Sequence, residues 1–145
     1  MDHLKILKKH LLDELKKTED VLASTKISRN NSPSAMESHS DETRSRLEGV
    51  ITMLEHKVKE INGFIKSIPT EKQTSTVIQL WSSADVELPD GKLKIFIVPE
   101  GLGGKQIEGT KFVSSKTPIG LSLLGKKAGE AFFFNDINGK VLSID

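Results

Sequence analysis

The sequence predicts an α+β protein in which an antiparallel helical hairpin, a coiled coil, precedes a small antiparallel β-sheet domain with one short helix. Apolar residues recur at three- and four-residue steps in the first half, which is typical of helices. Short runs of alternating apolar and polar residues fill the second half, as in strands. The pattern changes around residues 67–69. We therefore expect a hairpin over residues 1–68, a linker over 69–73 and the sheet domain over 74–145.

Each half of the hairpin carries one apolar stripe. The first stripe has Thr18 in the one place where an apolar residue is missing, and its members are Leu4, Leu7, Leu11, Leu15 and Leu22. The second alternates steps of four and three, and it comprises Leu47, Ile51, Leu54, Val58, Ile61 and Ile65. The second spacing is that of a heptad seam. We expect the two helices to pack seam to seam, in antiparallel directions.

The segment STKISRNNSPSAMESHSDETR, residues 24–44, connects the two stripes. The asparagine pair that starts at Asn30 is a turn signal, and Ser32 before a proline is typical of a helix N-cap. We therefore expect the tip near residues 27–33, after a first helix of about 24 residues, or roughly 36 Å. The alternative is a second helix that starts near Ser40, which would bring acidic residues close to the tip.

The second half contains short segments with the composition of strands, bounded by turn residues. The expected strands are residues 75–82, residues 85–99 as two strands joined at Asp90 and Gly91, residues 111–114, and residues 131–144 as a hairpin turning at Asn138 and Gly139. A short helix is expected over residues 118–124, because Thr117 is a good N-cap, Pro118 suits the first helical position and Gly125 suits a left-handed C-terminal cap.

The amino-acid composition excludes several kinds of functional site. The chain has no cysteine, which excludes disulfides, thiolate metal sites and cysteine nucleophiles. Lys and Arg total 21 against 20 Asp and Glu, so the chain has no domain-wide basic stripe that would bind duplex nucleic acid. No apolar run approaches the ~20 residues of a membrane span, and the amphipathic N-terminus differs from a signal peptide. We expect a cytoplasmic monomer with no membrane contact and with a protein partner.

Several other motifs have structural interpretations. Gly101, Gly103 and Gly104 superficially resemble a phosphate-binding loop, but the lysine after them is followed by neither Ser nor Thr. A loop with positive φ angles is the simpler expectation. The four histidines, at positions 3, 10, 39 and 56, have no partners at ligand spacing, so we expect them at the surface. Most aromatic residues of the second half, Phe133 among them, occupy strand positions expected in the core.

Residues 95–107, IFIVPEGLGGKQI, and 113–134, VSSKTPIGLSLLGKKAGEAFFF, together resemble the C-terminal, FKBP-like domain of the Gre (GreA/GreB) transcription elongation factor family. That family has a proline-containing turn, a leucine-rich helix, Leu-Gly-Lys-Lys, and Gly-Asp or Gly-Glu before a strand. The corresponding residues here are Thr117-Pro118-Ile119-Gly120, Leu123-Leu124-Gly125-Lys126-Lys127 and Gly129-Glu130. The expected hairpin is similar to the family's N-terminal coiled coil in length, order and direction.

The resemblance implies a factor that binds RNA polymerase at its secondary channel, with the sheet domain docked on the rim and the coiled coil inserted toward the active site. Such a factor is not an independent enzyme, because the polymerase itself cleaves backtracked RNA. Acidic tip residues of the family help to hold a second Mg²⁺ there, as two-metal phosphoryl chemistry requires. Lys126 and Lys127 belong to the matched motif and become candidate docking residues. No cofactor is expected beyond Mg²⁺ shared with the polymerase.

The expected tip departs from the family in its charges. Residues 24–36 contain Lys26 and Arg29 but no Asp or Glu, so the tip alone does not bind a metal and is suited instead to nascent RNA or to the polymerase's own acidic metal site. The candidate metal-assisting acids are Glu37, Asp41 and Glu42, and the simpler interpretation of these acids is that they are favourable charges at a helix N-terminus.

We therefore expect the protein to occupy the channel and to modulate or inhibit transcription rather than to stimulate cleavage. The alternative is a coiled-coil interaction module that binds another protein, or itself, without polymerase.

Overall fold

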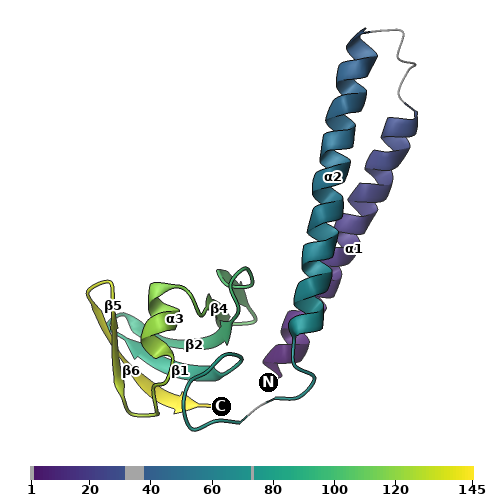
Figure 1. Cartoon of the computed structure of the whole chain (residues 1–145). Helices are drawn as coiled ribbons and strands as arrows, with labels where there is room; N and C mark the ends of the chain where they lie inside the picture. The colour runs from purple at the N-terminus through teal and green to yellow at the C-terminus, as the bar shows by residue number, and fades with distance from the viewer. Residues whose placement is uncertain (1, 32–37, 73) are drawn as a thin grey trace. The chain divides into compact units, whose positions relative to one another are not determined.

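The computed structural model describes residues 2–31, 38–72 and 74–145, except for the side chains of residues 38–41. A pair of long helices precedes a sheet domain with one short helix, so the predicted α+β fold class is confirmed (Figure 1). The chain divides into two units. Leu7–Ile68 form the helical unit, and Met1–Ile6 together with Pro69–Asp145 form the sheet unit.

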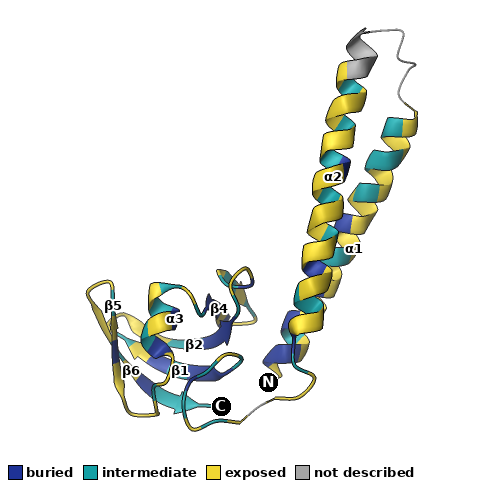
Figure 2. Cartoon of the chain, viewed as in Figure 1, coloured by how far each residue is buried: buried dark blue, intermediate teal, exposed yellow. Residues whose placement is uncertain are grey.

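The helical unit contains α2, Ser38–Ser67, and all but the first residues of α1, His3–Asn30, packed along the predicted seam. The buried members of the two stripes are Leu4, Leu7, Leu11, Thr18, Ile51 and Ile61, and their other members are half-buried. Figure 2 shows the burial along both helices. Thr18 fits the seam because its hydroxyl donates to the carbonyl oxygen of Glu14 at 2.8 Å. No helix in the described residues is long and apolar enough to cross a membrane.

The helix ends near the tip differ partly from the prediction. α1 extends to Asn30, where the asparagine turn signal was expected to end it, and it spans 28 residues. The expected N-cap at Ser32 lies outside the described residues. α2 is described from Ser38, close to the alternative start near Ser40.

The sheet unit contains one sheet with the strand order β3-β4-β2-β1-β6-β5. The strands are β1 (Ser83–Leu88), β2 (Gly91–Val98), β3 (Lys105–Ile107), β4 (Thr110–Ser114), β5 (Ala131–Phe134) and β6 (Ile137–Ile144). The helix α3, Pro118–Leu123, contacts β5 and β4. The hairpin predicted between β1 and β2 is present, but it turns at Pro89 and Asp90 rather than at Asp90 and Gly91, since Leu88 pairs with Gly91.

The sheet is mixed rather than antiparallel, which corrects one detail of the prediction. β2 and β4 pair in parallel, whereas the other strand pairings are antiparallel. β3 was not predicted from the sequence, and it turns back into β4 through Glu108 and Gly109, both with positive φ angles. That extra reversal lets β4 run in the same direction as β2.

Two further strand predictions were wrong. Residues 75–82 form no strand, and only Val77 makes an isolated bridge, to Lys127. Their alternation arises because Ile78, 1% exposed, is a loop residue buried in the core. The last hairpin turns at Asn135 and Asp136, with φ angles of 45° and 63°, rather than at Asn138 and Gly139. Asn and Asp tolerate this left-handed conformation better than other non-glycine residues.

The two faces of the sheet have different chemistry. The face toward α3 buries an aliphatic core with one aromatic ring, formed by Ile78, Ala84, Val86, Ile95, Ile97, Val113, Leu123, Phe132 and Val141. Because side chains alternate along a strand, the intervening residues of β1, β2 and β4 form the other face. This second face combines polar groups with Phe96, which packs edge-on against Phe112 and beside Trp81. Candidate functional side chains therefore occur on both faces of the sheet.

Candidate interaction site

Local sequence fixes α3 against the end of β4. The hydroxyl of Thr117 accepts from the backbone N–H of Gly120 at 3.2 Å and donates to the carbonyl oxygen of Ser114 at 2.7 Å. Pro118 follows as the first helical residue, as predicted. Gly120 lies so close to Ser114 that a Cβ atom would clash with its carbonyl oxygen. The motif residues of this turn therefore hold α3 in place.

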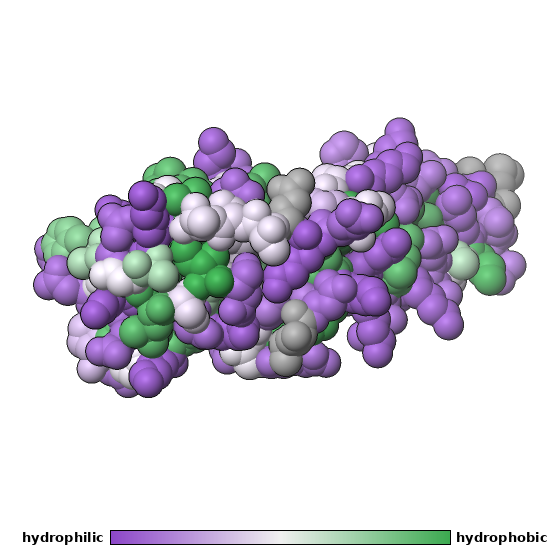
Figure 3. Space-filling model, turned by 90° about the horizontal axis from the view of Figure 1, so that it is seen from below, coloured by the Kyte–Doolittle hydropathy of each residue, from purple (hydrophilic) through white to green (hydrophobic). Residues whose placement is uncertain are grey.

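A groove opens between α3 and the edge strand β5. Its volume is about 460 Å³, and its lining residues are Leu121, Ser122, Leu124, Lys126, Ala131, Phe132, Phe133 and Asn138. We call it the α3–β5 groove. Leu121 is 60% exposed, Phe133 57% and Leu124 36%. Apolar surface is visible at the β5 end of the sheet unit (Figure 3).

The turn between α3 and β5 presents the two predicted lysines. Gly125 and Gly129 have φ angles of 82° and 89°, which favour glycine, so the chain can turn tightly at both positions. The carboxylate of Glu130 accepts from the backbone N–H of Lys127 at 2.8 Å and closes the turn. Lys126 lines the groove and Lys127 is exposed. Neither ammonium group forms an ion pair within the described part of the chain.

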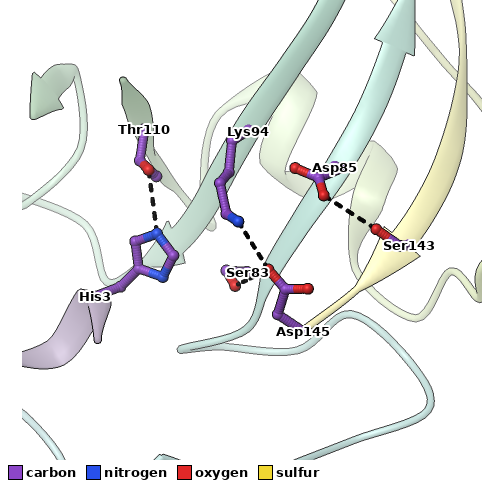
Figure 4. Close-up of polar contacts among 7 residues, drawn as sticks. All are labelled: His3, Ser83, Asp85, Lys94, Thr110, Ser143 and Asp145. Atoms are coloured by element: carbon purple, nitrogen blue, oxygen red, sulfur yellow. Dashed lines mark hydrogen bonds and ion pairs between the residues drawn. The ribbon is translucent and has the colours of Figure 1, made fainter. Parts of the chain in front are cut away.

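His3 lies on the second face of the sheet. Its ring stacks on Phe96 with centroids 5.2 Å apart, and its Nε2 forms a hydrogen bond with Thr110 Oγ1 at 3.1 Å (Figure 4). Burial, followed by the nearby Lys94 charge, lowers the pKa of His3 below its ordinary value. The expectation that all four histidines lie at the surface is therefore wrong for His3, because aromatic stacking and one hydroxyl satisfy its ring.

Beside His3, polar side chains bridge neighbouring strands. Lys94 Nζ lies 3.0 Å from Asp145 Oδ2, which also accepts from the Ser83 hydroxyl at 3.3 Å (Figure 4). Hydrogen bonding between Lys94 and Asp145 raises the pKa of the lysine and lowers that of the carboxyl group. Ser143 similarly donates to Asp85 at 3.1 Å. These partners satisfy one another, so the cluster resembles a structural network more than a reactive site.

The structure describes the predicted tip residues only in part. Lys26 and Arg29 lie near the end of α1 and are half-buried, and Arg29 Nε donates to Asn30 Oδ1 at 3.3 Å. Asp41 and Glu42 lie near the start of α2, where Glu42 is exposed. Glu37 lies outside the described residues. Among the described residues, no group of three or more His, Cys, Asp or Glu could hold a metal ion.

The structure brings Lys126 together with groove residues that the sequence analysis did not select. Phe133 was expected in the core, but it is substantially exposed, and so is Leu124. Leu123, in contrast, is fully buried. The sequence signal for the groove is the apolar run of β5 immediately after a lysine-containing turn. That run does not indicate which of its side chains are exposed.

No protein-family model and no curated protein matches this chain significantly. Among solved structures, GreA factor homolog 1 (Gfh1) of Thermus thermophilus is 15% identical, with 95% of this chain and 94% of that chain covered and a TM-score of 0.43. Gfh1 of Thermus aquaticus is 19% identical, with 97% and 94% covered and a TM-score of 0.43. Another structure, of the transcription factor Gfh1, is 17% identical, with 97% and 94% covered and a TM-score of 0.42. Scores this low leave the function to be argued from the residues themselves.

Proposed function

We propose that this chain is a Gre-like transcription elongation regulator that binds RNA polymerase at its secondary channel. The sheet unit docks through the α3–β5 groove and the lysines beside it, and the helical pair enters the channel toward the active site. The chain acts as an accessory factor without a cofactor of its own. The only metal involved is the Mg²⁺ of the polymerase.

The proposal rests on one observation: the motif that resembles the Gre family forms exposed surface rather than only core. Leu121 and Phe133 present apolar area beside Lys126 and Lys127, whose charges have no ion-pair partner in the described residues. Exposed apolar side chains gathered beside a pocket are typical of protein-binding sites. The adjacent cations favour an acidic partner and faster association with it.

The tip chemistry favours occupation of the channel over assistance to cleavage. Lys26 and Arg29 place cations near the end of α1, where they are suited to RNA phosphates or to the polymerase's acidic metal site. Metal assistance would require carboxylate oxygens at the same place. Asp41 and Glu42 remain the alternative providers, because they lie near the start of α2.

Retention on immobilised core RNA polymerase tests the docking proposal. We compare the wild-type chain, a Lys126→Glu, Lys127→Glu double variant and a control double variant, Lys92→Glu, Lys111→Glu, whose lysines are exposed and do not line the groove. The first double variant should associate more slowly and with an altered salt dependence, while the control retains wild-type binding. Absence of wild-type retention even at low salt would contradict the proposal.

The second candidate function is an interaction module that acts without polymerase. Large apolar side chains are exposed along the helices, namely Val21 at 52%, Ile27 at 60% and Met53 at 63%. Met53 also lines a hollow of about 540 Å³ on α2 with Gly49 and His56. Two results together would favour this candidate. The wild-type chain would self-associate in a concentration-dependent way that Met53→Lys abolishes, and it would not be retained on polymerase.

A further inference from the structure

α2 carries a second stripe of residues on the side away from its buried seam. The steps of this stripe alternate between three and four residues, and its members, all exposed, are Arg46, Gly49, Met53, His56 and Glu60. Residues at this spacing share one side of a helix. Because each helical residue advances by about 100°, the seam residues Ile51, Leu54 and Val58 lie on the other side of α2. We call the exposed set the outer stripe.

The middle of the outer stripe is apolar and hollowed. Met53 is 63% exposed, and no large apolar side chain in the described residues is more exposed. The hollow around it has a volume of about 540 Å³ and is also lined by Gly49, Thr52, His56, Lys57 and Glu60. Lys57 Nζ lies 3.8 Å from Glu14 Oε1, so an acid of the chain already compensates its charge. A Cβ atom at Gly49 would meet nothing within 4 Å, so another helix can approach closely there.

The outer stripe is complementary to its own reverse. Arg46 and Glu60 lie seven residues before and after Met53, so opposite charges stand at equal distances from the methionine. When a second α2 packs antiparallel with its Met53 at the same level, Arg46 of each copy lies opposite Glu60 of the other. Neither side chain forms an ion pair within the described part of the chain. Both charges are therefore available to a second copy.

We propose that two copies of this chain pair through their outer stripes, antiparallel and about a two-fold axis at Met53. The same patch then supplies both halves of the interface, as in other two-fold dimers. The methionines meet at the axis, in the space that Gly49 leaves open, and two Arg46–Glu60 contacts fix the register. One helix face is smaller than a standard protein interface, so the pairing is weak and depends on concentration.

Pairing has a regulatory consequence that rests on the proposed function. Four packed helices are about twice as wide as the helical pair alone, so paired chains are excluded from the secondary channel. The unpaired chain is the form that binds polymerase. Self-pairing thus limits how much of the chain can occupy the channel.

Charge variants test the register of the pairing, which sedimentation equilibrium of the full chain measures over a range of concentrations. Glu60→Arg and Arg46→Glu should each weaken pairing by about tenfold, because each places like charges opposite one another twice. An equimolar mixture of these two variants should pair again, since every contact then joins an arginine to a glutamate. The control Glu55→Arg changes an exposed acid of α2 outside the outer stripe and should have no effect.

A cysteine variant tests the position of the axis. The chain has no cysteine, so Met53→Cys introduces a single thiol. Two such thiols face each other across the axis, and mild oxidation should link the copies by a disulfide. Glu55→Cys should remain unlinked under the same conditions. The reduced Met53→Cys chain should be retained on immobilised core RNA polymerase, and the linked dimer should not.

The possible failures are distinguishable. Sedimentation as a monomer at every concentration up to about 1 mM, wild-type pairing by Glu60→Arg, or a variant mixture that pairs no better than its components would overturn the proposed pairing. Retention of the linked dimer on polymerase would overturn its regulatory consequence. Pairing with the predicted charge dependence, but without polymerase retention of the unpaired chain, would support the pairing and contradict the proposed function.

Discussion

Among single residues, His3 combines a titratable ring with deep burial. It is 5% exposed, stacks on Phe96 and faces Thr110. Burial is the main cause of the lowered pKa of this ring, and the charges of Lys94 and Lys72 act in the same direction, while Asp145 opposes them. The first residues of α1 thus contribute to the sheet unit through a neutral imidazole.

This burial predicts a loss of stability in mild acid. Since the folded pKa of His3 is below the ordinary value of 6.5, the unfolded chain binds more protons as the pH falls past that value. The free energy of unfolding should therefore be highest above about pH 6.5 and should decrease from there toward the folded pKa. Urea unfolding of the sheet unit within the full chain, followed by Trp81 fluorescence at a series of pH values, measures this decrease.

The control for this prediction is His3→Gln, which keeps a hydrogen-bonding side chain and removes the titration. Its unfolding free energy should change less between about pH 7 and pH 5 than that of the wild type. Identical pH dependence in the two proteins would show that His3 titrates normally in the folded state.

At the scale of elements, the β5–β6 hairpin depends on Gly139 for space rather than for its turn. A Cβ atom at Gly139 would clash with the ring of Phe132, its cross-strand partner. Gly139→Ala should therefore destabilise the sheet unit by about 1–3 kcal/mol, measured by urea unfolding, because it overpacks a filled core. Unchanged stability of Gly139→Ala would contradict this packing, because a glycine within the turn itself would have no Phe132 ring against it.

A matched glycine substitution in α2 should have the opposite effect. At Gly49 an added Cβ would meet nothing within 4 Å, so Gly49→Ala should stabilise the helical unit by about 0.5–1 kcal/mol through reduced backbone entropy. Circular dichroism of the helical transition measures it. Destabilisation by Gly49→Ala would indicate a helix packing that the structure does not show.

The elements differ in how far sequence could predict them. Both long helices and α3 follow from apolar spacing and caps, since these signals are local. Asn135 and Gly139 are each typical of a turn, and no local signal indicates that Gly139 instead pairs with Phe132 across the hairpin. β3 was missed because three residues are too few to show a period. The groove was predicted only in part. Lys126 follows from the motif, whereas the exposure of Phe133 is connected with the position of β5 at the edge of the sheet.

At the scale of the whole molecule, the charges near the tip predict the effect on transcription. Bound to backtracked elongation complexes, the chain should slow transcription and release few short 3′ RNA fragments, because Lys26 and Arg29 place cations near the end of α1, whereas metal assistance needs carboxylate oxygens there. Lys26→Ala with Arg29→Ala should relieve the slowing. Gel analysis of the RNA measures both effects.

The matched variant for this prediction removes the three candidate acids, Glu37→Ala, Asp41→Ala and Glu42→Ala. It should change RNA cleavage little if the tip only occupies the channel. Strong Mg²⁺-dependent cleavage by the wild type that disappears in the triple variant, with polymerase binding retained, would instead restore a metal-assisting role for these acids.

Site-specific photo-crosslinking to core RNA polymerase tests the central claim most directly. A crosslinking residue is placed at Leu121 in the α3–β5 groove, at Lys26 near the tip, or at Lys111 outside the groove. The proposed docking predicts crosslinks from Leu121 to the rim of the secondary channel and from Lys26 to its interior, with little product from Lys111. Equal crosslinking from all three positions, or none from Leu121, would contradict polymerase docking through this groove.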